Sequence, residues 1–220
     1  MDNNMILSPA QKALAINLDD SIYGSFVEIG AGQEVVRNFF RVGSASGTIA
    51  KTMSAYDKDF SDAIYEKEPD GRYVCKSRLE KMLQKEYSLL EERLNRDNYK
   101  NTRYFAFADT IATINYSKTT KGHGWMGLRF QLTPDQKPSD FIIHVLLNDP
   151  DAQLQQETVG IIGTNMLHAC FNETDPKEIL KQLYDNLSKD KVQIDMIEVL
   201  GPAFDPVSYT HLTLPTNREV

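Results

Sequence analysis

Apolar residues in the first half of the chain recur mostly with the spacing of helices. In four segments they return every three to four positions with polar residues between them, the pattern of a helix with one buried face. Ser8 and Pro9 precede the first segment, where a serine can accept hydrogen bonds from free amides and a proline fits the first turn. The predicted helices span Ala10–Ile16, Gln33–Phe40, Thr48–Tyr65 and Ser77–Arg96.

Alternating apolar and polar residues become frequent after Thr102 and predict strands. Two further apolar segments, with Asp175-Pro176 opening the second, predict helices at Gln153–Phe171 and from Asp175 to about Leu187. We therefore expect one α+β domain over residues 1–204, with an N-terminal helical portion and an antiparallel sheet of about four strands packed with helices. The predicted sheet consists of one strand region over Tyr104–Ala108 and Thr110–Tyr116, followed by strands at Trp125–Leu132, Phe141–Leu147 and Val192–Val199. A separate brief strand is predicted at Ser25–Ile29.

The segment Val207–Val220 shows neither the spacing of a helix nor the alternation of a strand. Its first ten residues are identical to one translated frame of a transposon-based sequencing adapter. We therefore expect residues 205–220 to be a non-native tail, and we leave them out of the functional argument as an expression scar would be. We also expect the native protein to continue past Phe204, so that residues 1–204 are the N-terminal part of a longer chain.

Composition narrows the classes of function. The chain has 220 residues, with 24 Lys and Arg against 31 Asp and Glu, and a net charge of -7. This acidic balance argues against nucleic acid as a partner. The two cysteines lie far apart in the sequence and have no ligand spacing, which argues against a disulfide framework or a zinc ribbon. Without a run of about 18 apolar residues or a secretory signal, we expect a cytoplasmic protein that does not enter a membrane.

Glycine-rich turns before two predicted helices are candidate binding sites. Gly30 and Gly32 follow a strand, where bare amides at a helix start could bind an anion. The segment resembles the first motif of the S-adenosylmethionine-dependent methyltransferases, but Glu34 stands where the third glycine would be. The alternative is a simple tight turn. We keep both glycines as pocket candidates.

The second turn is the better anion-site candidate. It gathers hydroxyl groups, backbone amides and a lysine near one predicted helix start, which are the groups that bind phosphate. It matches neither a P-loop nor a nucleophile elbow, and a flexible connection is the alternative. The anion-binding candidates are Ser44, Ser46, Gly47, Thr48 and Lys51.

A histidine between two glycines is the remaining candidate for chemistry. His123 is sterically open and titrates near neutral pH, so it could act as an acid, a base or a ligand, and Arg129 follows on the same predicted strand. An exposed hairpin histidine is the alternative. Neither His144 nor His168 has a second ligand four residues on, so we expect no metal site.

Two glycines inside the predicted helix Gln153–Phe171 indicate close packing. Gly160 and Gly163 each cost close to 1 kcal/mol relative to alanine in a helix interior. We expect a neighbouring helix or strand to approach there, either from the same chain or from a second subunit.

Five blocks of the sequence are specific when taken together: Glu28–Val35, Gly47–Asp57, Phe60–Tyr65, Gly71–Cys75 and His123–Phe130. They resemble a poorly characterised family of cytosolic bacterial proteins about twice as long. The resemblance spans about Leu7 to Phe204. Family members carry the name nicotinate-nucleotide adenylyltransferase and, in some lineages, TonB-dependent receptor. The first name implies ATP, magnesium and a mononucleotide, although the His-x-Gly-His motif of that enzyme superfamily is absent here. The second conflicts with the sequence, which lacks a series of about 10-residue lipid-facing strands.

Two functions follow as hypotheses. The first is an enzyme that handles a nucleotide or a phosphorylated small molecule, with the second glycine-rich turn as anion ligand and His123 or Arg129 stabilising charge. The second is a non-catalytic interaction or oligomerisation module, a homo-oligomer for example, because the chain shows no complete catalytic constellation. The sequence identifies no cofactor and no catalytic residue, and it leaves open whether the protein is an enzyme.

Overall fold

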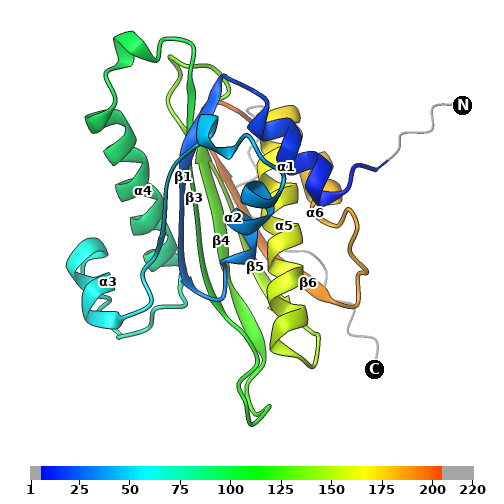
Figure 1. Ribbon diagram of the computed structural model, residues 1–220. Helices are drawn as coiled ribbons and strands as arrows, with labels where there is room; N and C mark the ends of the chain where they lie inside the picture. Colours follow the sequence, from blue (N-terminus) through cyan, green and yellow to red (C-terminus); the bar gives the residue numbers. More distant parts are fainter. Residues whose placement is uncertain (1–5, 205–220) are drawn as a thin grey trace, which may run out of the picture.

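A six-stranded mixed sheet forms the centre of the protein (Figure 1). The computed structural model describes residues 6–204, so the segment interpreted as an adapter-derived tail lies outside the described residues. The strand order is β2-β1-β3-β4-β5-β6. Strand β1 runs parallel to both of its neighbours, whereas the remaining neighbours pair in antiparallel fashion. The strands are β1 (Ile22–Gly30), β2 (Ile49–Ser54), β3 (Arg103–Ala112), β4 (Gly122–Phe130), β5 (Ser139–Leu147) and β6 (Val192–Leu200).

The expectation of an antiparallel sheet of about four strands is therefore wrong. The sheet has six strands, and its β2-β1-β3 part is parallel. Two causes explain the error. Parallel strands are joined by long crossovers and leave no hairpin signal in the sequence. In addition, Ile49 and Met53 are spaced like one face of a helix, yet residues 49–54 pair with β1 as a strand, because sheet pairing overrides a weak local pattern.

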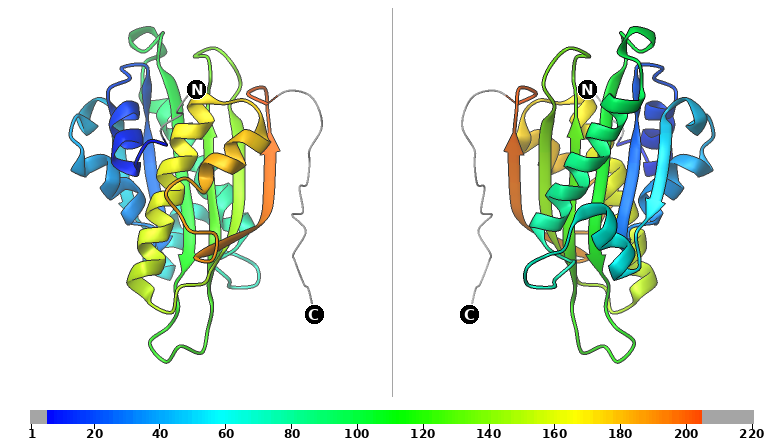
Figure 2. Two further views of the ribbon diagram at one scale, coloured as in Figure 1. Left: turned by 90° about the vertical axis from the view of Figure 1, so that its right-hand side faces the viewer. Right: turned by 90° about the vertical axis from the view of Figure 1, so that its left-hand side faces the viewer.

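Helices cover both faces of the sheet (Figures 1 and 2). We call the two sides the α5 face and the α4 face. None of the helices within residues 6–204 combines the length and hydropathy that a membrane span would need. The α5 face carries α1 (Pro9–Asn17), α2 (Glu34–Arg41), α5 (Ala152–Asn172) and α6 (Pro176–Leu183), and the α4 face carries α3 (Lys58–Tyr65) and α4 (Lys76–Arg93).

The larger core lies between the sheet and α5. Helix α5 is buried along most of its length and contacts the three other helices of its layer as well as β4 and β5. Helix α4 instead buries one stripe against β3, β4 and β1, as its amphipathic pattern predicts. The stripe consists of Leu79, Met82, Leu83, Tyr87 and Leu90.

The helix start at Ser8 is confirmed in detail. The Ser8 hydroxyl accepts a hydrogen bond from the amide of Gln11 (3.3 Å), and the Gln11 side chain accepts one from the amide of Ser8 (2.9 Å). This reciprocal arrangement pairs donors that the helix itself leaves free.

The two glycines of α5 allow α2 to approach, which confirms the close packing that they predict and places it within this chain. A Cβ atom added at Gly160 would lie 2.8 Å from the Cβ of Glu34. One added at Gly163 would lie 2.5 Å from Cγ2 and 2.7 Å from Cγ1 of Val35. Both helices sit on the α5 face, so this contact holds the crossover between β1 and β2 against the core.

We expect Gly163→Ala to lower the free energy of unfolding. Overpacking costs about 1–3 kcal/mol, against close to 1 kcal/mol gained in helix propensity. Gly47→Ala is the matched control, because an added Cβ meets nothing within 4 Å at Gly47, and its stability should change by less than about 0.5 kcal/mol. Urea denaturation gives the free energy of unfolding of the parent and of both variants. A Gly163→Ala protein as stable as the parent would show that α2 and α5 are not closely packed.

Candidate functional site

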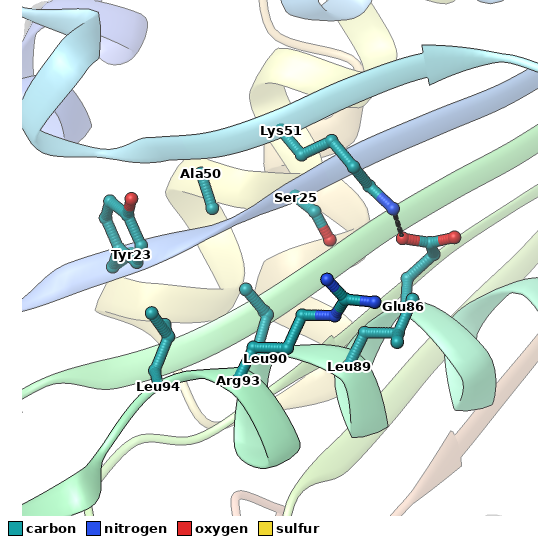
Figure 3. A pocket seen from close by; sticks show the side chains of 9 residues that line it. All are labelled: Tyr23, Ser25, Ala50, Lys51, Glu86, Leu89, Leu90, Arg93 and Leu94. Carbon is teal, nitrogen blue, oxygen red and sulfur yellow. Dashed lines mark ion pairs between the residues drawn. The ribbon is translucent and has the colours of Figure 1, made fainter.

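A cavity of about 450 Å³ lies on the α4 face, between strands β1 and β2 and the C-terminal half of α4 (Figure 3). Its volume is within the range of about 300–1,000 Å³ that is usual for small-molecule sites. We call it the β1–α4 pocket. It is lined by Tyr23, Ser25, Ala50, Lys51, Glu86, Leu89, Leu90, Arg93 and Leu94.

Local periodicity builds the walls of this pocket. On α4, the lining residues Glu86, Leu90 and Arg93 are three or four positions apart and so share one side of the helix. On the sheet, Ser25 and Lys51 are direct partners in the parallel register of β1 and β2. Their side chains therefore leave the sheet on the same side, towards α4.

A buried ion pair closes one end of the pocket. Lys51 forms a salt bridge with Glu86, drawn as a dashed line in Figure 3. The Glu86 side chain is only 1% exposed and also accepts a hydrogen bond from the Tyr65 hydroxyl (2.7 Å). Burial, followed by the negative charge of Glu86, raises the pKa of Tyr65. The lysine, which is 42% exposed, thus joins a buried carboxylate to the open pocket.

Two polar groups in the pocket have no partner among the described residues. The Ser25 hydroxyl is buried and makes no hydrogen bond. Arg93 is exposed and forms none of the ion pairs within residues 6–204. In Figure 3 its guanidinium group points towards the end of the pocket that holds Lys51 and Glu86. The Arg93 guanidinium group is therefore available to a ligand, whereas the Ser25 hydroxyl is covered by the protein.

The other end of the pocket is apolar and aromatic. Leu90 and Leu94 lie beside the ring of Tyr23, which stacks on Tyr99 with centroids 6.1 Å apart. Burial raises the pKa of Tyr23, with smaller contributions from Tyr99 and Tyr104, so its hydroxyl stays neutral. The arrangement suits a molecule with an apolar or ring-shaped body and one anionic group.

Of the five residues predicted to bind an anion together, the structure brings one to this pocket. Ser46 and Gly47 are exposed in a three-residue 3₁₀ helix, Ala45–Gly47, and Ser44 precedes it with a φ of 58°. Thr48 is buried, and Lys51 extends to Glu86. Lys51 lies on strand β2 rather than near a helix start, and its side chain pairs with Glu86 instead of converging with the other four residues.

The other glycine-rich turn packs against buried acids. Glu28 and Asp109 are direct partners on β1 and β3, on the α5 face near the carboxyl ends of both strands. The position of a Cβ on Gly32 is taken by the Asp109 carboxyl group, and Gly30, with a φ of +92°, lies against the carbonyl oxygen of Ile111. These two glycines therefore serve a close approach of the backbone to the sheet.

Burial raises the pKa of both acids in this pair. Glu28 is 4% exposed, and burial raises its pKa to about 7, although a hydrogen bond from Ser54 opposes the rise. Asp109 is fully buried, and neither carboxyl oxygen has a hydrogen-bond partner among the described residues. Burial, followed by the charge of Glu28, raises the pKa of Asp109 well above its usual value.

The remaining two candidates lie on β4, outside the β1–α4 pocket. Arg129 forms a bidentate salt bridge with Asp140, with Nε to Oδ1 at 2.7 Å and Nη2 to Oδ2 at 2.6 Å. It borders a second cavity of about 570 Å³ on another side of α4. His123 lies near His144 of β5. Its location near a second histidine is a consequence of strand pairing that the sequence analysis did not foresee.

Sequence reasoning missed Glu86, Arg93, Tyr23 and Ser25. Glu86 and Arg93 belong to a correctly predicted helix but were taken for its polar side. Only the pairing of β2 beside β1 shows that this side faces a cavity. The one feature of the sequence that could have indicated these residues is their spacing. Glu86 and Arg93 lie four and three positions from the buried Leu90, which places both on its side of the helix.

Comparison with known proteins shows similarity of fold only. No family model matches the sequence, and no curated protein matches it either. A solved competence or damage-inducible protein from Enterobacter asburiae is similar in structure, with a TM-score of 0.50, 11% identity, and coverage of 76% of this chain and 99% of that one. At this identity the likeness establishes a shared fold and nothing about activity.

Two further solved structures are similar at slightly lower scores. A competence-damaged protein (CinA) superfamily protein from Enterobacter cloacae has a TM-score of 0.49 and 13% identity, with 74% of this chain and 91% of that chain covered. A competence/damage inducible protein, CihA, from Agrobacterium tumefaciens has a TM-score of 0.47 and 15% identity, with 72% and 93% covered.

We expect the contribution of Glu28 to the stability of the protein to fall as the pH rises towards neutrality. A folded-state pKa of about 7 for Glu28, against an ordinary 4.5, means that its contribution is fully present below pH 4.5 and is lost as the pH rises through 7. This interval corresponds to a loss on the order of 3 kcal/mol. Glu28→Gln mimics the protonated acid and should flatten the pH dependence of the unfolding free energy, measured by urea denaturation from pH 4 to 8.

The matched control is Glu92→Gln, which alters an exposed carboxylate on α4. Its pH profile should follow that of the parent. Parallel profiles for Glu28→Gln and the parent would show that Glu28 is ionised throughout.

Proposed function

We propose that this protein binds a phosphorylated small molecule, such as a nucleotide, in the β1–α4 pocket. The observation that carries this proposal is the local charge. The chain has a net charge of -7, yet the pocket gathers two cationic side chains, Lys51 and Arg93, against the single carboxylate of Glu86. A cavity of local positive charge in an acidic protein favours an anionic ligand.

The polar end of the pocket fits a phosphate group. The guanidinium group of Arg93 is free to form a bidentate pair with two phosphate oxygens, which is among the stronger charge-assisted contacts. Lys51 can donate to the phosphate while it remains paired with Glu86, because an ammonium group carries three donors.

The apolar end fits the body of the ligand. A planar ring would lie against Tyr23 and the side chains of Leu90 and Leu94, since aromatic and aliphatic walls bury such rings with little loss of conformational entropy. This preference favours a nucleotide over a sugar phosphate. It also agrees with the mononucleotide that the family resemblance implies, whereas the missing His-x-Gly-His motif supports no adenylyl transfer step.

One observation behind the alternative function, an interaction module, has another explanation. Gly160 and Gly163 of α5 pack against α2 within the chain, so they do not indicate contact with a second subunit. The pocket supplies a specific place for a small ligand.

Arg93→Gln should weaken nucleotide binding at least tenfold, because it removes the unpaired cation of the pocket. The measurement is a thermal-shift screen of the parent against nucleoside monophosphates and sugar phosphates, followed by calorimetric titration of the best compound. A ligand at 100 times its dissociation constant adds about 2.7 kcal/mol to the stability. Arg72→Gln is the matched control, since Arg72 is 80% exposed and does not line the pocket.

Ser46→Asp separates this pocket from the anion site predicted at the turn. A carboxylate at position 46 would repel a phosphate bound at the turn but should leave binding in the pocket unchanged. Loss of binding in Ser46→Asp with full binding in Arg93→Gln would move the site to the turn. If none of the compounds raised the melting temperature of the parent, the proposal would be wrong.

A further inference from the structure

Three neighbouring strands bring His123, His144 and Asp195 together on the α4 face, away from the residues that line the β1–α4 pocket. In the register of β4 and β5, Trp125 is opposite His144 and His123 is opposite Leu146, so the two histidines are diagonal neighbours. Diagonal side chains on one face are within reach of each other when they are long or aromatic.

An irregularity in the sheet adds the carboxylate. The partners of β5 change from Met196 opposite His144 to Ile194 opposite Val145, so Asp195 has no direct partner in the ladder. A bulge of this kind redirects a side chain. Here it places Asp195 Oδ1 2.7 Å from Nδ1 of His144.

The Asp195 carboxylate orients the His144 ring. A carboxylate beside Nδ1 favours the proton on that nitrogen, so in the neutral ring Nε2 carries the lone pair. A carboxylate on the far nitrogen of a ring is also the usual outer contact of a metal-binding histidine, because it orients the ring and raises the basicity of the ligating nitrogen.

The spacing of the two histidines matches a pair of metal ligands. Nε2 of His144 lies 3.5 Å from Nδ1 of His123, which is longer than the usual 2.7–3.2 Å of a hydrogen bond. Two nitrogen ligands bound at 2.0–2.1 Å to a tetrahedral ion are about 3.3–3.4 Å apart. A small movement of either ring would therefore allow both nitrogens to bind one ion.

We propose that His123 Nδ1 and His144 Nε2 form a two-histidine site for a divalent transition metal, with Asp195 as its positioning residue. Imidazole nitrogens suit Zn²⁺, Ni²⁺ and Cu²⁺. Within residues 6–204 no group of three or more His, Cys, Asp or Glu side chains is arranged to hold a metal, so water completes the coordination. Solvent reaches part of this cluster, because the His144 side chain is 16% exposed and that of Asp195 is 31% exposed. The proposal is independent of the function proposed for the pocket.

Trp125 provides the test. It is the single tryptophan of the chain, and its ring centroid is 4.8 Å from that of His144. Titration with Ni²⁺ or Cu²⁺ should quench tryptophan fluorescence with a saturable one-to-one curve. A chelator should reverse the quenching. Zn²⁺, which does not quench by itself, should compete with the quenching ion for the site and restore the fluorescence.

Variants distinguish this site from unspecific binding. His123→Asn and His144→Asn should each weaken quenching at least tenfold, and Asp195→Asn should weaken it about 10–100-fold, as expected for an outer contact. His211→Asn, which alters a histidine outside the described residues, should quench as the parent does. Circular dichroism and melting temperature show whether each variant is folded, and calorimetric titration with Zn²⁺ gives a second measurement on the parent. Quenching that does not saturate, or that is equal in His123→Asn and the parent, would overturn the proposal.

Discussion

The parallel pairing of β1 on both of its edges is the constraint on which the rest of the structure depends. A parallel strand cannot be reached by a hairpin, so the chain has to cross a face of the sheet after β1 and again after β2. The first crossing places α2 on the α5 face, and the second places α3 and α4 on the opposite face. The two crossings produce two distinct environments, one on each side of β1.

These two environments have opposite characters. On the α5 face, Glu28 and Asp109 are sealed beneath the Gly30–Gly32 turn, and burial suppresses their charge. On the α4 face, Ser25 and Lys51 leave the same pair of strands into a cavity with open access. Ser25 and Glu28 are only three positions apart on β1, yet side-chain alternation places one at the open cationic pocket and the other in the closed acidic site.

Buried charges hold α4 in the position that the cavity requires. Arg78, near the start of α4, is fully buried and forms ion pairs with Asp62 of α3 (2.7 Å) and with Glu68 (3.4 Å). Its guanidinium group also lies 4.9 Å from the ring centroid of Tyr73. Because breaking such a pair leaves an uncompensated buried charge, these contacts strongly oppose displacement of this end of the helix. The other end, from Glu86 onwards, forms a pocket wall instead of filling the space above β1.

Much of the fold could be predicted from the sequence, because its helices and long strands carry complete periodic patterns. Helices α1, α2, α4 and α5 lie within one to three residues of their predicted bounds at each end. Strand β2 could not be predicted, since its six residues are stabilised by pairing with β1 rather than by an alternating pattern. The candidate site could not be predicted for the same reason. Lys51 was predicted to bind an anion, but its partner Glu86 of α4 is 35 residues away and contacts it only because β2 pairs beside β1.

The ion pair between Lys51 and Glu86 is consistent with the proposed anion binding and contributes little net stability. Burying a carboxylate costs several kcal/mol, and well-packed apolar residues of similar volume are often as stabilising as a buried ion pair. Tyr65 and Lys51 offset that cost here, yet the lysine remains 42% exposed at the pocket. Glu86 restrains a long cationic side chain at one point of the pocket, so that less conformational entropy would be lost on binding of the anion that we propose.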